Sequence, residues 1–506
     1  NRTPLRIKEK QRIVQHMKLL FVQSDPFAWT GKMYISAVLK KAGHQCDVVI
    51  EPAEKDLIKS IKDISPNIVA FSATTGVHHW ALEKAKEIKE KLNLPILFGG
   101  PHATYHPQMI GEDCVDFVCR GEAEESVLEL MDKLERKEDI TKIKNFWIKS
   151  NGKIYKNDFR ELNGDLDTLP FPDRGLYYNK YEFLRNQKSR EFIFQRGCPY
   201  LCSFCYAPSL QKLVKHKGKY TRYMSVDRVI AELVDVKEKW GMESAMIFDE
   251  VLLLKKDWLY EFLIKFKKKL NISMTLESRA NLIDDEETVI RLKEAGTKCI
   301  RMGVETGTNY LRNAVLKKNL YNETIERSAE LLHKYGILLE TYNIIGLPRE
   351  TLDDAFETLK FNIKIKADYA LCCIFHPYPQ TDLAEIAIDD GMIPRNFFQH
   401  FEPSFYDKSP MKLDHKKEII NLHKFFSLTV KFPFLLPLVK LLIKLPNNRI
   451  FFFIWKAGYV YLSLLMTDIG FKGLFKLGKL TGNYWKRKKK KKNIPKELEQ
   501  SSPITD

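Results

Sequence analysis

The sequence predicts an α/β protein in three parts: a doubly wound, Rossmann-like amino-terminal domain, a partial (β/α)6 barrel of the TIM type, and a mostly helical carboxy-terminal region. Three observations predict this class. The chain has 506 residues, 44% of them hydrophobic, so more than one core is expected. Short apolar runs alternate with amphipathic helical patterns over most of the length. Beyond residue 395 this alternation stops, and lysines interrupt the apolar segments.

The amino-terminal domain is expected over residues 17–150, because "MKLLFV" at Met17 begins a buried strand. Its apolar runs lie at 19–22, 47–50, 68–71, 96–98 and 116–119, separated by amphipathic stretches such as "HHWALEKAKEIKEKL". Strands that alternate with helices form a parallel sheet, and ligands bind at the carboxyl ends of its strands. The first sixteen residues contain no apolar run, so no signal peptide is expected.

Residues 151–187 are expected to form an ordered linker, since "DLDTLPFPDRG" contains prolines but no Gly/Ser run. A second series of strands and helices is expected over residues 188–395. Its strands are "FIFQR", "SAMIFDE", "SMTLESR", "KCIRMGVETG", "LLETYNIIGLP" and "YALCCIFHP". Ser225 can cap the first long helix, and the helices at 285–295 and 322–335 end before glycines. Function in such a barrel collects where the strands end, and "FIFQR" leads directly into three cysteines.

The net charge of +17 is concentrated near the carboxyl terminus. Residues 411–492 hold 19 Lys/Arg and 3 Asp/Glu, a net charge of +16. Residues 396–485 are expected to be helical, basic and apolar, and residues 486–506, which begin with "KRKKKKK", are expected to be a disordered tail. The net positive charge is therefore a property of the carboxy-terminal region, and it gives little information about the two α/β domains. Nine cysteines are too few for a disulfide scaffold, which favours a reducing, cytoplasmic compartment.

The stretch "RGCPYLCSFCY" spaces Cys198, Cys202 and Cys205 as Cys-x-x-x-Cys-x-x-Cys. A structural zinc site is closed by four ligands, yet the nearest histidine is His216 and no second cysteine pair matches. Three thiolates can instead hold three irons of a [4Fe-4S] cluster and leave the fourth iron open. The spacing therefore favours a cluster with an open iron over zinc or inert thiols.

This loop, with the aromatic Tyr206 after its last cysteine, resembles the signature of radical S-adenosylmethionine (radical SAM) enzymes. The resemblance covers residues 188–385 and implies that the three cysteines hold the cluster. It also implies that S-adenosylmethionine binds the open iron and is cleaved to a 5′-deoxyadenosyl radical, which abstracts hydrogen from an unactivated carbon. The electron would come from an external one-electron reductant such as flavodoxin or ferredoxin.

Further barrel segments resemble the same family. "IFDE" would place Asp249 and Glu250 near the methionine amino group, where a carboxylate suits an ammonium. Arg279 of "SRANLID" suits a carboxylate or phosphate through its planar fork. The remaining residues that the resemblance assigns to the cofactor are Gly303 and Glu305 of "GVETG", and Gly346 and Pro348 of "GLPRET". "HPYPQT" at 376–381 resembles the segment that closes the sixth strand.

The amino-terminal domain resembles the cobalamin-binding domain fused to one branch of these enzymes. The resemblance lies in "SATTG", "FGGPHATYHP" and "DFVCRGEAEESV", and it assigns to cobalamin Ser72, Thr74, Gly99, Gly100, His102, Gly121 and Glu122. The corrin ring would lie between the two domains and face the cluster. A nucleotide is disfavoured, because "QSDPFAWTG" after the first strand lacks Gly-x-Gly-x-x-Gly.

The cobalt-ligating motif Asp-x-His-x-x-Gly is incomplete. Asp25 and Gly31 are present, but Phe27 stands at the histidine position and the glycine is one residue late. We therefore expect a lower cobalt face that carries water or a weak ligand. His102 is expected to form loop hydrogen bonds rather than bind cobalt, and His78 and His79 are expected to start a helix.

The tail segments "FPFLLPLVKLLIKLP" and "IFFFIWKAGYVYLSLLM" combine apolar faces with lysines, as interfacial helices do. The lysine run behind them suits anionic head groups, so contact with a membrane surface is weighed against a helical domain packed on the barrel. Nucleic acid is less favoured, because only Tyr484 and Trp485 could stack on bases near that run.

The sequence therefore predicts a cobalamin-dependent radical SAM enzyme that methylates or otherwise modifies an unactivated carbon of a small molecule, with a lipid-like substrate favoured by the tail. One alternative is an anaerobic oxidative cyclase of the tetrapyrrole type. The other is an RNA-modifying methylthiolase, which would need a second cluster. The amino-terminal domain has only Cys46, Cys114 and Cys119, and their spacing does not match.

Overall fold

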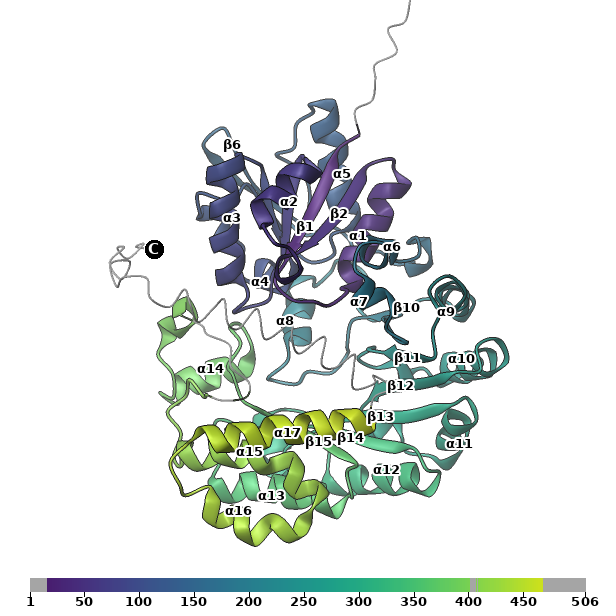
Figure 1. The fold of residues 1–506 in the computed structure, drawn as a ribbon, viewed down its shortest axis with the longest axis vertical. Helices are drawn as coiled ribbons and strands as arrows, with labels where there is room; N and C mark the ends of the chain where they lie inside the picture. The colour runs from purple at the N-terminus through teal and green to yellow at the C-terminus, as the bar shows by residue number, and fades with distance from the viewer. Residues whose placement is uncertain (1–15, 401–405, 407, 467–506) are drawn as a thin grey trace, which may run out of the picture.

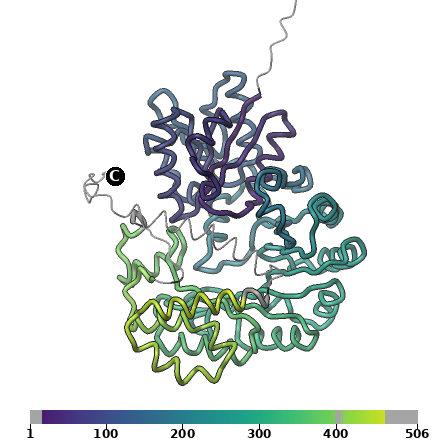
Figure 2. The backbone as a smooth tube through the Cα atoms, in the orientation of Figure 1, coloured from purple at the N-terminus to yellow at the C-terminus, as the bar shows by residue number. Residues whose placement is uncertain are grey.

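A computed structural model describes residues 16–400, 406 and 408–466, and it confirms the predicted fold class (Figure 1). Two parallel sheets, one in each half of the described chain, lie one above the other, and the carboxy-terminal helices cover the side of the lower one (Figures 1 and 2). The predicted tail at 486–506 lies outside the described residues.

The amino-terminal sheet has seven strands in the order β2-β1-β3-β4-β5-β6-β7. Its first five strands are parallel, and β6 and β7 add an antiparallel hairpin at one edge. The strands are β1 (Lys18–Gln23), β2 (Gln45–Ile50), β3 (Ile68–Ser72), β4 (Ile96–Gly99), β5 (Phe117–Cys119), β6 (Phe146–Ser150) and β7 (Lys153–Lys156). The sheet thus extends into the expected linker, because "KIYK" continues across a turn at Asn151 and Gly152.

Helices cover both faces of this sheet. One face packs against α1 (Thr30–Lys41) and α5 (Glu124–Arg136), and the other against α2 (Leu57–Ile64) and α3 (His78–Leu92). The short α4 (Gly100–Tyr105) follows β4 at the carboxyl edge. The sheet is therefore doubly wound, as the alternation of apolar runs predicts. The rest of the linker forms α6 (Gly175–Tyr178) and α7 (Glu182–Arg185).

The second sheet is a six-stranded, all-parallel open barrel in the order β15-β14-β13-β12-β11-β8. Its strands are β8 (Ser189–Phe192), β11 (Ser244–Ile247), β12 (Ser273–Ser278), β13 (Thr297–Glu305), β14 (Leu338–Ile345) and β15 (Tyr369–Ile374). The covering helices are α9 (Val226–Trp240), α10 (Lys256–Lys269), α11 (Glu286–Glu294), α12 (Asn322–Lys334), α13 (Leu352–Lys364) and α14 (Asp382–Asp389). Ser225 and Asp285 cap α9 and α11 by accepting hydrogen bonds from backbone N–H groups.

The strand predicted from "FIFQR" is wrong in its placement. The barrel strand β8 begins earlier and ends at Phe192, and Gln195–Arg196 forms a separate strand, β9, that pairs antiparallel with β10 (Arg222–Tyr223). The run therefore turns out of the barrel before the cysteines. The apolar residues hide this break, because Phe192 and Phe194 are both buried, although Ile193 between them is 39% exposed.

The carboxy-terminal helices are α15 (Lys416–Lys431), α16 (Leu436–Leu442) and α17 (Arg449–Met466). Helix α15 packs against β15, α13 and α17, so it closes the open edge of the barrel. Among the residues that the structure describes, no helix combines the length and apolar character that crossing a bilayer requires.

Candidate active site between the two domains

The cysteine loop lies between β9 and α8 (Tyr206–Leu213), at the carboxyl end of the barrel strands. Gly197 opens the loop with a φ of +84°, and a Cβ there would lie 2.3 Å from the Tyr220 carbonyl oxygen, so only glycine fits. Cys202 is buried, Cys198 and Cys205 are half-buried, and all three are free thiols. The loop thus presents three thiols at the edge where a barrel binds its ligands.

The three sulfurs lie farther apart in this structure than the ligands of one zinc ion do. Two sulfurs bound to one zinc lie at most about 4.6 Å apart, since each Zn–S bond is about 2.3 Å. In the described chain, ligand atoms of three such residues converge within 4.8 Å only at His16, His44 and Glu135, so the loop sulfurs are spread more widely. Burial, with smaller contributions from neighbouring groups, raises the pKa of Cys198 to about 11 and of Cys205 to about 12. A cationic iron cluster that spans the three sulfurs fits this set, because metal binding converts thiols to thiolates.

The two carboxylates after β11 have different surroundings. Asp249 is 1% exposed, and its Oδ1 accepts hydrogen bonds from the backbone N–H groups of Phe194 and Gln195 at 2.8 and 2.9 Å. These two hydrogen bonds hold the turn between β8 and β9. Burial raises the pKa of Asp249 to about 8. Glu250 is exposed, and its charge contributes to the raised pKa values of Cys198 and Cys205. Of the two, Glu250 faces the thiols.

At the end of β13, the Glu305 carboxylate forms an ion pair with Lys318 Nζ at 2.6 Å, and both side chains are more than nine-tenths buried. Glu305 has a φ of +66°. A Cβ on Gly303 would lie 2.3 Å from the Glu305 carboxylate and 2.6 Å from Lys318 Nζ. The glycine of "GVETG" therefore makes room for this pair. Lys318 carries no sequence signal, because it lies in an irregular loop before α12.

The "GLPRET" turn after β14 is closed by its own residues. Gly346 has a φ of +75°, and Pro348 is buried. Glu350 accepts hydrogen bonds from the backbone N–H groups of Gly346 and Leu347. Burial raises the pKa of Glu350 to about 8. The acidic residue of the motif thus stabilises the turn, and this was not predicted.

On the amino-terminal domain, Ser72 pairs in register with Gly99, and both Ser72 and Thr74 are exposed. Gly100 has a φ of +87°, and a Cβ there would lie 2.8 Å from Ser72 Oγ and 3.0 Å from the Ala73 backbone nitrogen. The chain therefore passes closely over the end of β3, and the space beside Gly100 is taken by Ser72 and Ala73 of the protein itself. Gly121 also has a positive φ, of +69°, and donates its N–H to Thr104 Oγ1.

Glu122 lies apart from these residues. Its carboxylate forms ion pairs with Arg222 and, at 3.4 Å, with Arg196, and both arginines belong to the barrel half. Arg196 is also paired with Glu124. The glutamate expected at the cobalamin site therefore joins the two domains through buried arginine contacts.

Four histidines form a stack at the carboxyl edge of β3 and β4. His102 lies between His78 and His106, with ring centroids 3.7 and 4.9 Å away, and His79 follows His78 at 3.9 Å. Burial lowers the pKa of His78 to about 3 and of His102 to about 2, so both are neutral near pH 7. His102 Nδ1 forms the expected hydrogen bond, with Thr75 Oγ1 at 3.1 Å, but His102 lies in the short helix α4 and not in a loop. His78 and His79 start α3, as predicted.

The two domains meet directly beside the cysteine loop. The rings of Tyr105 and Tyr206 stack at 4.3 Å, and the Tyr105 hydroxyl donates to the Tyr206 carbonyl oxygen at 3.0 Å. Tyr206 also lies within hydrogen-bond reach of Thr75, at 3.4 Å. Tyr206 follows Cys205 directly, so the edge that carries Gly100 and the histidines faces the loop that carries the thiols. Neither Thr75 nor Tyr105 was predicted, because a contact between domains leaves no local pattern.

Two family models match the chain. The model of the radical SAM superfamily matches residues 192–361, and the model of the B12 binding domain matches residues 25–131. Among curated proteins, the uncharacterized methyltransferase PH0819 of Pyrococcus horikoshii is 31% identical over 372 residues, which are 72% of this chain and 79% of that protein. The anaerobic magnesium-protoporphyrin IX monomethyl ester cyclase of Rubrivivax gelatinosus is 25% identical over 378 residues, 71% of this chain and 65% of the cyclase.

Solved structures share the fold. The radical S-adenosylmethionine methyltransferase TsrM of Kitasatospora setae aligns with a TM-score of 0.62 at 17% identity, over 75% of this chain and 77% of that chain. The cobalamin-dependent S-adenosylmethionine radical enzyme OxsB aligns with a TM-score of 0.58 at 18% identity, over 76% of this chain and 56% of that chain. The same order of a doubly wound domain and an open barrel thus occurs in both.

Proposed function

The chain belongs to the radical SAM superfamily, in the branch with a B12-binding domain, and we propose that it transfers a methyl group to an unactivated carbon of a hydrophobic small molecule. It is a radical SAM enzyme whose cofactors are a [4Fe-4S] cluster, S-adenosylmethionine and cobalamin. The observation that carries the proposal is the contact of Tyr105 with Tyr206, which brings the edge of the cobalamin domain against the cysteine loop.

We assign Cys198, Cys202 and Cys205 as the three cluster ligands. When bound, the cluster and S-adenosylmethionine supply a 5′-deoxyadenosyl radical, and the corrinoid supplies the methyl group. Glu250 is the exposed carboxylate beside the thiols, so we assign it to the ammonium of S-adenosylmethionine. Asp249 holds the backbone that leads into the cysteine loop, and Glu350 holds the turn after β14.

We assign the corrinoid to the edge formed by Ser72, Thr74, Gly99 and Gly100, where the hydroxyls of Ser72 and Thr74 are exposed. Phe27 supplies no imidazole, and Asp25 is occupied by Trp29 Nε1 at 2.7 Å and by the Phe27 N–H. We therefore infer that this loop supplies no histidine to the lower face of the cobalt. The histidine rings stacked around His102 are then uncharged, so they would contact the corrinoid as neutral rings and not as charged partners.

A product assay tests the reaction. The reconstituted enzyme is incubated without oxygen with S-adenosylmethionine carrying a deuterated methyl group, a one-electron reductant, hydroxocobalamin and a lipid extract. Methyl transfer predicts 5′-deoxyadenosine, S-adenosylhomocysteine and a lipid heavier by one labelled methyl group. A parallel incubation replaces the lipid extract with a polar extract. Labelled products only with the polar extract would contradict a hydrophobic substrate, and no labelled product with either extract would contradict methyl transfer.

An oxidative cyclase is the second candidate, and the similarity to the Rubrivivax gelatinosus cyclase favours it. The same assay separates the two reactions. A cyclase would form 5′-deoxyadenosine without S-adenosylhomocysteine and without a labelled product.

We also propose that the carboxy-terminal helices touch an anionic membrane surface, which supports the choice of a hydrophobic substrate. Residues 419–466 contain no Asp or Glu. Phe434, Leu441 and Phe453 are 78%, 66% and 66% exposed, and exposed lysines lie between them at Lys440 and Lys444. Apolar side chains with interspersed lysines are typical of interfacial helices, and each lysine near an anionic surface contributes about 1 kcal/mol.

Vesicle flotation tests this contact. Vesicles that contain phosphatidylglycerol should carry the protein upwards, and neutral phosphatidylcholine vesicles should carry much less. Leu441→Glu should abolish flotation, whereas Ile264→Glu, which changes an equally exposed residue on α10, should leave it unchanged. Equal recovery of both variants with anionic vesicles would contradict the assignment of this surface.

A further inference from the structure

Arg279 directs its guanidinium at the cysteine loop. Its Nη1 donates to Cys202 Sγ at 3.6 Å, its Nη2 donates to the Lys318 carbonyl oxygen at 2.6 Å, and its Nε donates to Asn281 Oδ1 at 3.1 Å. The guanidinium carbon lies 3.7 Å from the centre of the Tyr200 ring, which belongs to the same loop. Two residues of the cysteine loop are therefore in contact with one cation.

This cation is buried without a carboxylate. Arg279 is 7% exposed, and within the described part of the chain no ion pair joins it to Asp or Glu. A buried charge is costly unless hydrogen bonds or an opposite charge compensate it. Its neighbour Lys318 offers no charge of opposite sign, because it is itself a cation and is paired with Glu305.

Two other buried arginines direct their hydrogen bonds to oxygen atoms. Arg190 donates to backbone carbonyl oxygens, among them those of Leu184 and Trp240. Arg312 donates to the Val304 carbonyl oxygen and to side-chain amide oxygens. Arg279 differs because one arm of its fork points at sulfur, which is a weak acceptor as a neutral thiol and a strong one as a thiolate. Nη1 therefore points at the atom that would bind iron if Cys202 is a cluster ligand.

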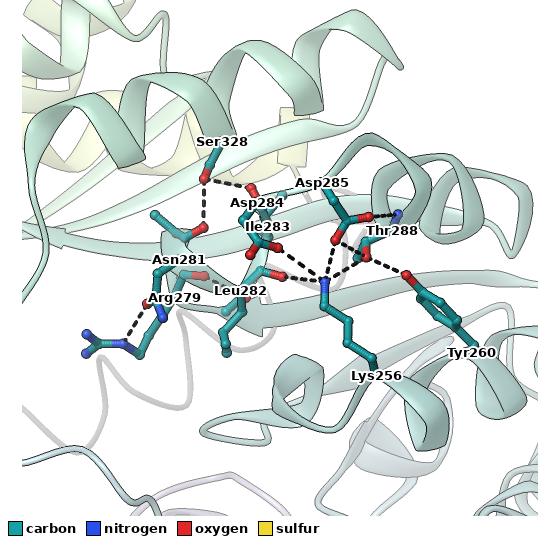
Figure 3. A network of polar contacts seen from close by, with 12 residues as sticks. Lys256, Tyr260, Arg279, Asn281, Leu282, Ile283, Asp284, Asp285, Thr288 and Ser328 are labelled. Carbon is teal, nitrogen blue, oxygen red and sulfur yellow. Dashed lines mark hydrogen bonds and ion pairs between the residues drawn. The ribbon is translucent and has the colours of Figure 1, made fainter.

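The turn that carries Arg279 is held from two sides (Figure 3). The Ser328 hydroxyl on α12 lies 2.7 Å from the Ala280 carbonyl oxygen and 2.9 Å from that of Ile283. Lys256 Nζ donates to the Leu282 carbonyl oxygen and, at 2.7 Å, to Asp285. Asn281 completes the arrangement by donating to the Tyr200 hydroxyl at 3.2 Å. The direction of the guanidinium is therefore fixed by contacts within the protein.

We propose that Arg279 is a positioning residue that raises the reduction potential of the cluster by donating a charge-assisted hydrogen bond to the Cys202 thiolate. Hydrogen bonds to cluster sulfurs and nearby positive charge stabilise the reduced, more negative state. The step is a one-electron reduction: one electron passes from an external low-potential donor to the cluster, and no bond or proton changes at Arg279. The inference deepens the proposed function, because it rests on a cluster at Cys198, Cys202 and Cys205.

A potential titration followed by electron paramagnetic resonance tests this role. Arg279→Met removes the charge and the donors but keeps an apolar stem. We expect its midpoint potential to fall by at least 59 mV, which is a tenfold change in the one-electron equilibrium. Lys317→Met is the matched control, because it removes the same charge from an exposed neighbouring residue that pairs with Asp382. We expect the control to keep the potential of the unchanged enzyme.

Arg279→Lys decides the case if Arg279→Met loses its cluster. A lysine keeps the charge but lacks the fork that reaches both Cys202 and Lys318, so its potential should lie below that of the unchanged enzyme. An unshifted potential in either variant with a full iron complement would overturn the inference. Iron and sulfide content measured on the same samples keeps two failures apart, since an unchanged enzyme without a cluster would instead contradict the proposed function.

Discussion

Beside the candidate site, the barrel and the amino-terminal domain present different kinds of side chain, although Glu122 and Glu124 pair with barrel arginines elsewhere along the boundary. The barrel presents charged groups that are already oriented: Arg279 points at Cys202, and Lys318 is paired with Glu305. The amino-terminal domain presents hydroxyls, glycines and a stack of neutral histidines around His102. The difference follows from the two ligands. An iron cluster and a sulfonium substrate carry charge, which fixed charges recognise, whereas a corrin ring is recognised by a closely approached backbone and by shape.

The glycines of the two regions show the same contrast. Gly303 in the barrel leaves space for an ion pair, and Gly100 in the amino-terminal domain leaves space for a backbone crossing. Both were predicted as cofactor residues from their motifs. The structure supports a division in which the barrel glycine serves electrostatics and the amino-terminal glycine serves close approach.

The largest expected effect is on the barrel side. Cys202→Ala removes one of three cluster ligands, so we expect complete loss of 5′-deoxyadenosine formation and of the iron signal. Cys299→Ala is the matched control, since Cys299 is a buried thiol outside the loop. Deoxyadenosine measured by mass spectrometry checks both variants, and persistent formation in Cys202→Ala would remove that residue from the ligand set.

The second effect tests the buried charge of the barrel. Lys318→Met leaves Glu305 as a buried, unpaired carboxylate, and we expect the free energy of unfolding to fall by about 3–5 kcal/mol. Lys317→Met breaks only a surface pair and should cost less than about 1 kcal/mol. Denaturation by urea checks the difference, and equal losses would show that the pair contributes no more than a surface contact.

The third effect tests close approach on the amino-terminal side. Gly100→Ala adds a Cβ at 2.8 Å from Ser72 Oγ in a left-handed backbone, so we expect loss of cobalamin binding and a fall in unfolding free energy of about 2–4 kcal/mol. Gly152→Ala has the same backbone strain with open space around it and should cost about 1–2 kcal/mol. Cobalamin retained on size-exclusion chromatography checks the site; normal retention by Gly100→Ala would place the corrinoid elsewhere.

The smallest effect concerns the neutral histidine stack. The pKa values of His78 and His102 are lowered by burial to about 3 and about 2, below the value of about 6.5 in the unfolded chain. The unfolded state therefore binds more protons as the pH falls below about 6.5, and stability should fall by about 1.4 kcal/mol per pH unit for each histidine.

Between pH 6 and pH 5, His102→Phe should lower the pH dependence of the unfolding free energy by the contribution of one histidine, about 1.4 kcal/mol per pH unit. Urea denaturation at the two pH values measures this change. The exposed His216→Gln is the control and should keep the slope. An identical slope in His102→Phe would show that His102 is protonated in the folded protein.

Much of the fold could be predicted because its periodic signals are local. The α3 helix matches "HHWALEKAKEIKEKL" residue for residue, and Ser225 caps α9 as expected. The errors lie where the chain leaves a regular element without losing apolar character, as it does between Phe192 and Gln195. The hairpin strand β7 was missed for a related reason, since it is short and half polar.

The candidate site could be predicted only in its motif residues. Cys198, Cys202 and Cys205 share one loop, so their spacing is visible in the sequence. Lys318 lies outside every motif, and it enters the site through its ion pair with Glu305. Thr75 and Tyr105 lie within "SATTG" and "FGGPHATYHP", but their contacts with Tyr206 are tertiary, which no single stretch encodes. Asp249 and Glu122 are acidic residues in motifs, yet one holds a backbone turn and the other joins two domains.

The central claim is that the cluster at the cysteine loop faces the corrinoid across the contact of Tyr105 with Tyr206. The most direct test is electron paramagnetic resonance of enzyme that contains both the reduced cluster and cob(II)alamin, compared with enzyme that contains either one alone. The account predicts spectra that are broadened or split by coupling between the two centres. A spectrum equal to the sum of the two singly loaded samples would contradict it.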